Sequence, residues 1–368
     1  MTDGLPKLAL AHFGGAWLLR RDGREDEYRH PARLLDETLE RGFNAIAVDA
    51  FPHLVAPRPD GVVLDRFEVI CDHREYLAQP RKALLELMRM ASERNLKVWL
   101  TSRFLADTQS RRSFVRRPRD FVDVWSHTLR VLQQHDLLHP VVAVDWCEHF
   151  PLPPAAHGVQ RALFRRQPNP LTPLLPWSPA VERRVEQYLH EVPRALKAVF
   201  PTVRFGLSVS GGSERHLRKL DTSELDFMDR HAFLDDDPRY ALLTGAPVKG
   251  FAGRVAGALQ GRVASAAWRA RKRQWRRQQE DGLHEFSDFC RVRRMTPALT
   301  RGYVRLGSEW QADWDFVREV SDFMVRAALG QDIPVITPAL YARPHTPALW
   351  DRRDWLRELN GLITAPAR

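Results

Sequence analysis

Residues 303–314 read YVRLGSEWQADW and place the carboxylate of Glu309 between the tryptophans Trp310 and Trp314. This stretch reads as a short strand whose last residues leave the sheet and carry Glu309. A polar residue at the carboxyl end of a strand is well placed for function when the other strands run parallel to it. We therefore expect the rest of the chain to hold this strand end in place and to bring further polar groups to it.

Seven other segments read as short, apolar strands that alternate with helices. These strands are expected at residues 8–12, 43–49, 96–101, 140–145, 203–209, 225–231 and 333–337. Strands that are apolar throughout indicate burial of both faces. Regular alternation with helices indicates a parallel sheet, either doubly wound or closed. Eight repeats favour the closed form, an α/β fold of the (β/α)8 TIM barrel type.

The chain is expected to be a single domain over residues 1–368, since no interdomain linker separates its repeats. Long loops are expected after strands 2, 4 and 6 of the barrel. The loop at residues 152–179 is too long for an ordinary connection and suggests a functional loop or lid. An arginine-rich helical insertion is expected at about residues 235–282.

Composition is that of an ordinary globular protein, with 44% hydrophobic and 28% charged residues. No apolar run approaches the length of a membrane span. The N-terminal residues lack the features of a secretory signal. The three cysteines lie far apart, which argues against a disulfide framework or a CxxC metal site. These features favour a cytoplasmic location.

The chain is basic, with a net charge of +10 from 56 Lys and Arg against 46 Asp and Glu. Most arginines are scattered, but one dense patch, RARKRQWRR, runs from Arg269 to Arg277. It reads as a solvated helix face, with an anion contact as the alternative. No nucleic-acid-binding motif accompanies the patch, so a nucleic acid is not the expected partner.

Polar and aromatic side chains gather at the predicted carboxyl ends of the strands. They are His12, Trp17, Asp49, Arg103, Asp145, Glu148, His149, Ser208, Ser210, Asp229, His231, Glu309, Trp310 and Tyr341. In a (β/α)8 barrel these ends surround the site. Carboxylates can do acid–base or nucleophilic chemistry there, and flat aromatic rings stack on the C–H face of a sugar.

Five short segments, in this order along the barrel, resemble the cellulase-like glycoside hydrolases of clan A. They are GFNAI at 42–46, DWCEHFP at 145–151, DRH at 229–231, SEW at 308–310 and LWD at 349–351. The resemblance implies hydrolysis of a β-linked carbohydrate by a retaining mechanism. Glu309 would be the nucleophile and Glu148 the general acid/base, with no cofactor and no metal. The implied substrate-binding residues are His12, Trp17, Asp49, Arg103, Asp145, His149, His231, Trp310 and Tyr341.

The sequence departs from this pattern at strand four. The clan usually carries Asn-Glu there, whereas this chain has Cys147-Glu148 or, shifted by one, Glu148-His149. In the first register the asparagine is lost, and in the second the acid is replaced by His149. A catalytically impaired, carbohydrate-binding barrel of the same fold is therefore the alternative.

A metal-dependent hydrolase is a further alternative from another enzyme class. His12, Asp49, His149 and His231 would surround a divalent ion. Such barrels usually open with His-x-His on the first strand, and here Leu10 stands two residues before His12.

Overall fold

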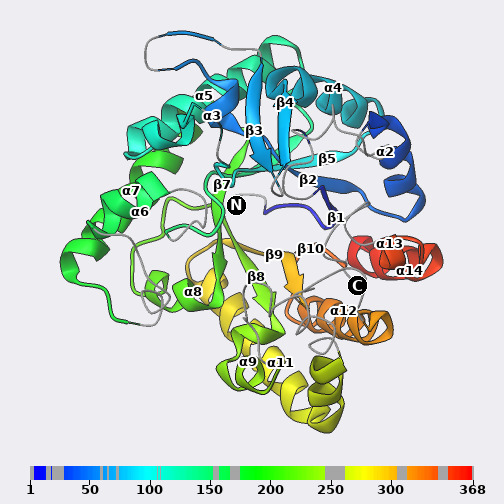
Figure 1. The fold of residues 1–368 in the computed structure, drawn as a ribbon. Coiled ribbons are helices and arrows are strands. Elements are labelled where there is room, and N and C mark those ends of the chain that lie inside the picture. The colour runs from blue at the N-terminus through cyan, green and yellow to red at the C-terminus, as the bar shows by residue number, and fades with distance from the viewer. Residues whose placement is uncertain are drawn as a thin grey trace.

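The computed structural model shows a closed barrel of eight parallel strands surrounded by helices (Figure 1). It describes residues 4–13, 18, 29–58, 61–63, 66–71, 74–105, 107, 109–151, 157–165, 175–244, 262–304, 313–338 and 347–366. The closed ring confirms the expected TIM barrel.

The barrel strands follow one another around the ring in the order in which they occur in the chain. They are β1 (Leu8–Phe13), β2 (Ala45–Asp49), β5 (Lys97–Thr101), β6 (Val141–Asp145), β7 (Arg204–Ser210), β8 (Phe227–Phe233), β9 (Thr296–Tyr303) and β10 (Val335–Ile336). Parallel pairing of β10 with β1 closes the ring. Each strand therefore delivers its last residues to the same end of the barrel.

The long helices lie on the outside of this ring (Figure 1). They are α2 (Pro31–Glu40), α4 (Pro80–Glu93), α5 (Pro118–Gln134), α7 (Pro179–Val199), α11 (Lys272–Val292), α12 (Trp314–Leu329) and α14 (Arg353–Thr364), with the shorter α8 (Gly211–Leu217) between α7 and α11. Four of them start with proline, whose fixed φ suits the first helical position and whose missing N–H is not needed there.

The hydrophobic core has two parts, one inside the barrel and one between the barrel and the helices. Alternate strand residues point inward and form a small cluster around Trp99 and Phe227, whose ring centroids are 4.3 Å apart. The opposite strand faces pack with the helices into a larger cluster. The inner cluster fills the barrel below the carboxyl ends of the strands and supports the side chains at those ends.

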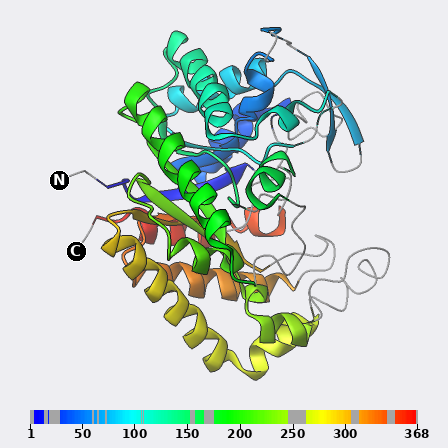
Figure 2. The same ribbon diagram turned by 90° about the vertical axis from the view of Figure 1, so that its left-hand side faces the viewer.

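Further elements follow the strand ends. They are α3 (Pro52–Val55), the antiparallel hairpin of β3 (Phe67–Cys71) and β4 (Arg74–Ala78), the 3-10 helices η2 (Arg111–Phe114) and η3 (Leu234–Asp236), α6 (His157–Phe164), α9 (Pro238–Thr244) and α13 (Pro347–Trp350). Figure 2 shows the hairpin and α9 on the side opposite to the two chain termini. The described elements that follow the second, fourth and sixth barrel strands (β2, β6 and β8) thus lie at the carboxyl end of the barrel.

The seventh barrel strand lies earlier in the chain than expected. It runs over Thr296–Tyr303, so it ends where the expected strand begins. Glu309 and Trp310 belong to residues 305–312, outside the described part of the chain. The strand contains Pro297, Arg301 and Gly302, which are atypical of a buried strand and hid it in the sequence.

Two other expectations need correction. Only a long loop was expected after the second barrel strand, at residues 52–79, and this segment contains the helix α3 and the hairpin of β3 and β4. The arginine-rich helical insertion was expected to end at about residue 282, but the helix that holds part of the patch runs from Lys272 to Val292. Among the described helices, none has the length and apolar character to cross a membrane.

Candidate functional site

The ends of the barrel strands enclose a small polar hollow. Side chains from six strands and from the turn after β6 surround about 180 Å³ of space between atoms, packed so closely that no water-sized sphere fits among them. The lining residues are His12, Ala47, Trp99, Thr101, Asp145, Glu148, Asp229, His231, Thr300 and Arg301. Because Ala47 and Trp99 also belong to the inner core cluster, that cluster forms the apolar floor of the hollow.

Glu148 lies in the turn just after β6, and its carboxylate is buried in the hollow with 2% exposure. The turn is fixed by its backbone, since the Glu148 amide donates to the Ser102 carbonyl at 3.0 Å. One carboxylate oxygen, Oε1, accepts from Nη1 of Arg301. The other oxygen, Oε2, lies 3.6 Å from Nε of Arg103 and 3.4 Å from the Thr101 hydroxyl. Both oxygens of Glu148 are therefore occupied by cationic or hydrogen-bonding partners.

Arg301 extends from β9 across the hollow to Glu148 and is itself 4% exposed. Its Nε and Nη2 atoms contact Nε2 of His12 on β1 at 3.1 and 2.8 Å. Burial and the charge of Arg301 lower the pKa of His12 well below its ordinary value, so His12 is neutral and Nε2 can accept. Three strand ends are thereby joined in one hydrogen-bonded set.

The ion pairs decide the protonation state of Glu148. Burial alone would raise its pKa, but the charges of Arg301 and Arg103 outweigh burial and hold the pKa well below the ordinary value. Glu148 is therefore an ionised carboxylate, and it is poorly suited to donate a proton to a leaving group.

A second chain of contacts connects two histidines to Asp229. Nδ1 of His231 lies 3.2 Å from Nε2 of His149, and Nε2 of His231 lies 3.2 Å from Oδ2 of Asp229. His149 also approaches Oε1 of Glu148 to 3.5 Å. Burial, then the neighbouring His231, lowers the pKa of His149 to about 4, so this ring is neutral at pH 7.

Asp49 and Asp145 hold backbone at the strand ends. The carboxylate of Asp49 accepts from the amides of Phe51 and Arg103, each at 2.9 Å. Asp145 accepts from the Cys147 amide at 3.2 Å and interacts with the Ser208 hydroxyl. Burial raises the pKa of Asp49 to about 7 and that of Asp145 well above its ordinary value. Both carboxyls shape the turns that carry Arg103 and Glu148.

The structure brings most of the expected site residues together. His12, Asp145, Glu148 and His231 line the hollow. Arg103 and His149 contact Glu148, and Asp49 accepts from the Arg103 amide. Four expected residues lie outside the described part of the chain: Trp17, Glu309, Trp310 and Tyr341. For these four, the expected roles remain predictions.

Sequence reasoning missed Arg301 and Thr300. Both belong to a segment that was not recognised as a strand, and an irregular register in the pairing of β8 with β9 breaks the simple alternation of its side chains. The proposed metal set of His12, Asp49, His149 and His231 is only partly assembled, because His12 faces Arg301 and Asp49 holds backbone amides. The histidines 149 and 231 do meet, with Glu148 beside them.

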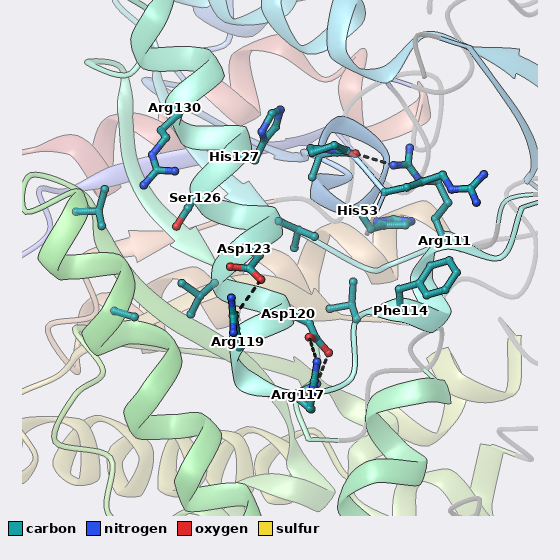
Figure 3. Close-up of a pocket in the computed structure, with 18 residues that line it drawn as sticks. His53, Arg111, Phe114, Arg117, Arg119, Asp120, Asp123, Ser126, His127 and Arg130 are labelled. Carbon is teal, nitrogen blue, oxygen red and sulfur yellow. Dashed lines mark hydrogen bonds and ion pairs between the residues drawn. The ribbon is translucent and has the colours of Figure 1, made fainter. Parts of the chain in front are cut away.

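A larger groove of about 830 Å³ lies on the outside of the barrel along α5 (Figure 3). Its wall includes His53, Arg111 and His127, together with the pairs Arg117–Asp120 and Arg119–Asp123 at 3.3 and 3.7 Å. None of the residues that line the hollow lines this groove. The groove is thus separate from the strand ends.

The arginine-rich stretch is partly neutralised by acids from α12 and its N-terminal cap. Lys272 and Arg276 lie 2.6 and 3.6 Å from Oε1 of Glu319, and Arg269 lies 3.2 Å from Asp313. Arg277 keeps 84% of its side chain exposed. These contacts fit the solvated helix face expected from the sequence, and an anion contact there remains a prediction.

Several solved structures superpose on this barrel. A candidate glycoside hydrolase from Parabacteroides distasonis superposes with a TM-score of 0.83 at 20% identity, covering 98% of this chain and 94% of that one. An endocellulase of Pyrococcus horikoshii, solved with cellotetraose, gives 0.55 at 12% identity and covers 96% and 92%. A family 5 mannosidase of Rhizomucor miehei gives 0.55 at 9% and covers 98% and 94%.

At these identities the structural likeness establishes the fold alone. Among curated proteins, none matches the chain. The sequence itself matches one family model, described as sugar-binding cellulase-like, over residues 10–364. Because this match covers nearly the whole chain, the protein belongs to the sugar-binding, cellulase-like family and has the fold of the clan A glycoside hydrolases.

Proposed function

We propose that the protein binds β-linked carbohydrate at the carboxyl end of its barrel and does not cleave it by the paired-carboxylate route. One observation carries the proposal: among the described residues of the seventh strand, Thr296–Tyr303, the side chain that faces Glu148 is Arg301. Retaining hydrolysis needs two carboxyl groups about 5 Å apart, one of which donates a proton. An ionised Glu148 held by two arginines does not supply that proton.

The rim of the hollow offers groups for binding a sugar. Arg103 keeps 32% of its side chain exposed and His149 keeps 18%, while Glu148 and Arg301 lie behind them. Guanidinium and imidazole N–H groups can donate to sugar hydroxyls, and their positions are fixed by the buried carboxylates. The family description as sugar-binding supports the same function.

Hydrolysis of β-linked carbohydrate by Glu148 and Glu309 is the second candidate. The observation in its favour is that Glu148 follows the fourth barrel strand and points into the hollow, where a general acid/base would act. For this candidate, a bound substrate would have to displace Arg301 or Arg103 from Glu148, because only then could the carboxylate gain a proton.

Calorimetry and product analysis on the same protein separate the two candidates. The purified chain is titrated with cellotetraose and mannotetraose, and parallel samples are assayed for released sugar. We expect saturable binding without products, and weaker binding by Arg103→Ala than by the control Arg326→Ala, whose exposed pair with Asp322 lies on α12. Products that disappear in Glu309→Gln would establish the hydrolase. If the protein neither binds nor cleaves these or related β-linked oligosaccharides, both candidate functions are overturned.

A further inference from the structure

Three potential metal ligands converge beside the hollow: Glu148, His149 and His231. Nε2 of His149 lies 3.2 Å from Nδ1 of His231 and 3.5 Å from Oε1 of Glu148, and the three atoms lie within 4.8 Å of one another. In a tetrahedral zinc site with bonds of about 2.1 Å, neighbouring ligand atoms are about 3.4 Å apart. We infer that Glu148, His149 and His231 form a binding site for a divalent transition metal such as Zn²⁺.

The second coordination sphere is already in place. Asp229 faces Nε2 of His231 at 3.2 Å and so turns Nδ1 toward the cluster. Asp229 is in turn fixed by the amide of Thr300 at 2.9 Å and by the Thr300 hydroxyl. A carboxylate on the far nitrogen of a metal-binding imidazole fixes the tautomer and strengthens the ligand.

His149 is held toward the cluster by its backbone. Its amide donates to the Ser208 hydroxyl at 3.0 Å, and its φ of 60° lies in the left-handed region, which non-glycine residues seldom adopt. Such a conformation persists when surrounding contacts impose it, and it is often found at functional sites.

Arg301 is the competitor of the metal, because its Nη1 occupies the same oxygen of Glu148 that faces His149. The metal and the guanidinium repel each other, so binding requires Arg301 to move toward Oε2 or His12. Removing the charge in Arg301→Met should tighten metal binding, although the same change removes an ion pair of the metal-free protein.

The test is a titration of the purified, chelator-treated chain with Zn²⁺ by calorimetry, and with Co²⁺ by visible absorption. We expect one ion per chain and the intense visible bands of tetrahedral Co²⁺. His149→Gln and His231→Gln should abolish both signals. Asp229→Asn should weaken affinity by about 10- to 100-fold. The control His284→Gln removes an exposed histidine 3.3 Å from Asp288 and should change neither signal.

Circular dichroism of each variant separates lost ligands from lost structure. Zn²⁺ binding that persists in the folded double variant His149→Gln/His231→Gln would overturn the inference and would assign the ion to surface groups. Absence of binding in both the natural chain and a folded Arg301→Met variant would also overturn it. The cluster would then be a hydrogen-bonded histidine pair. Neither result depends on whether the protein binds or cleaves carbohydrate.

Discussion

Arg301 on the seventh barrel strand forms a buried ion pair with Glu148, which follows the fourth strand 153 residues earlier in the chain. The two side chains are 4% and 2% exposed, so neither charge is screened by bulk water. The pair joins the seventh strand to the end of the fourth, and its positive partner keeps Glu148 ionised. This one contact therefore connects the stability of the barrel with the chemistry that its site can perform.

Breaking this pair from one side should destabilise the protein strongly. Arg301→Met leaves Glu148 buried with Arg103 as its remaining ion-pair partner among the described arginines, and we expect a loss of about 3–5 kcal/mol in the free energy of unfolding. The double variant Arg301→Met/Glu148→Met should recover much of that loss, since the fully buried carboxylate is gone and Arg103, at 32% exposure, can be solvated. Denaturant unfolding measures both.

The matched control for this pair is Arg326→Met on α12. Arg326 lies 3.0 Å from Asp322, but the two side chains are 49% and 38% exposed. An exposed pair contributes at most about 1 kcal/mol. Equal losses in Arg326→Met and Arg301→Met would contradict the special role of burial at the barrel centre.

His53 should make the protein sensitive to acid. It lies buried on α3, with Nε2 2.9 Å from the Leu105 carbonyl, and burial lowers its pKa to about 3. Between pH 6.5 and 3 the unfolded chain binds a proton that the folded chain does not. Stability therefore falls as pH falls, by at most about 1.4 kcal/mol per pH unit. Relative to the natural chain, His53→Gln should lose less stability over this range, as unfolding free energies at several pH values would show.

Asp49 should act in the opposite direction. Burial raises its folded-state pKa to about 7, whereas the unfolded carboxyl titrates near 3.8. As pH rises from about 4 to 7, the unfolded chain releases a proton that the folded chain retains, so this group makes the protein less stable. Asp49→Asn removes that decrease. The stability of the natural chain relative to Asp49→Asn should thus fall across this range, and a constant difference would argue against the raised pKa.

The sequence predicted the barrel well where strands are apolar on both faces. The fourth strand was expected at residues 140–145 and is observed at Val141–Asp145, because an uninterrupted apolar run bounded by polar residues has few other interpretations. The seventh strand was missed because Arg301 reads as a solvent-facing residue. Its burial is possible only through Glu148 and His12, and such distant partners leave no local signal.

The sequence predicted those site residues that belong to correctly recognised strands. His12, Glu148 and His231 were found because they follow or end recognised strands, and parallel strands bring such residues together. What the sequence could not supply was the pairing within the hollow. Whether Glu148 is a proton donor or an ionised carboxylate depends on which neighbour faces it, and that neighbour belongs to the strand that was misplaced.

Two glycine-to-alanine changes should have opposite effects on stability. Gly302 on β9 is paired with Ala232 on β8, and a Cβ at residue 302 would lie 2.2 Å from the Ala232 carbonyl oxygen. Because that oxygen belongs to the backbone of a packed strand, Gly302→Ala must push two barrel strands apart, at a cost of about 1–3 kcal/mol.

Gly361 lies on the exposed side of α14, and a Cβ there would meet no atom within 4 Å. Gly361→Ala should stabilise the protein by about 1 kcal/mol, since alanine loses less backbone entropy in a helix. Thermal and denaturant unfolding of both variants measure the two effects. A Gly302→Ala variant as stable as the natural chain would contradict the close approach of β8 and β9, and with it the position from which Arg301 reaches Glu148.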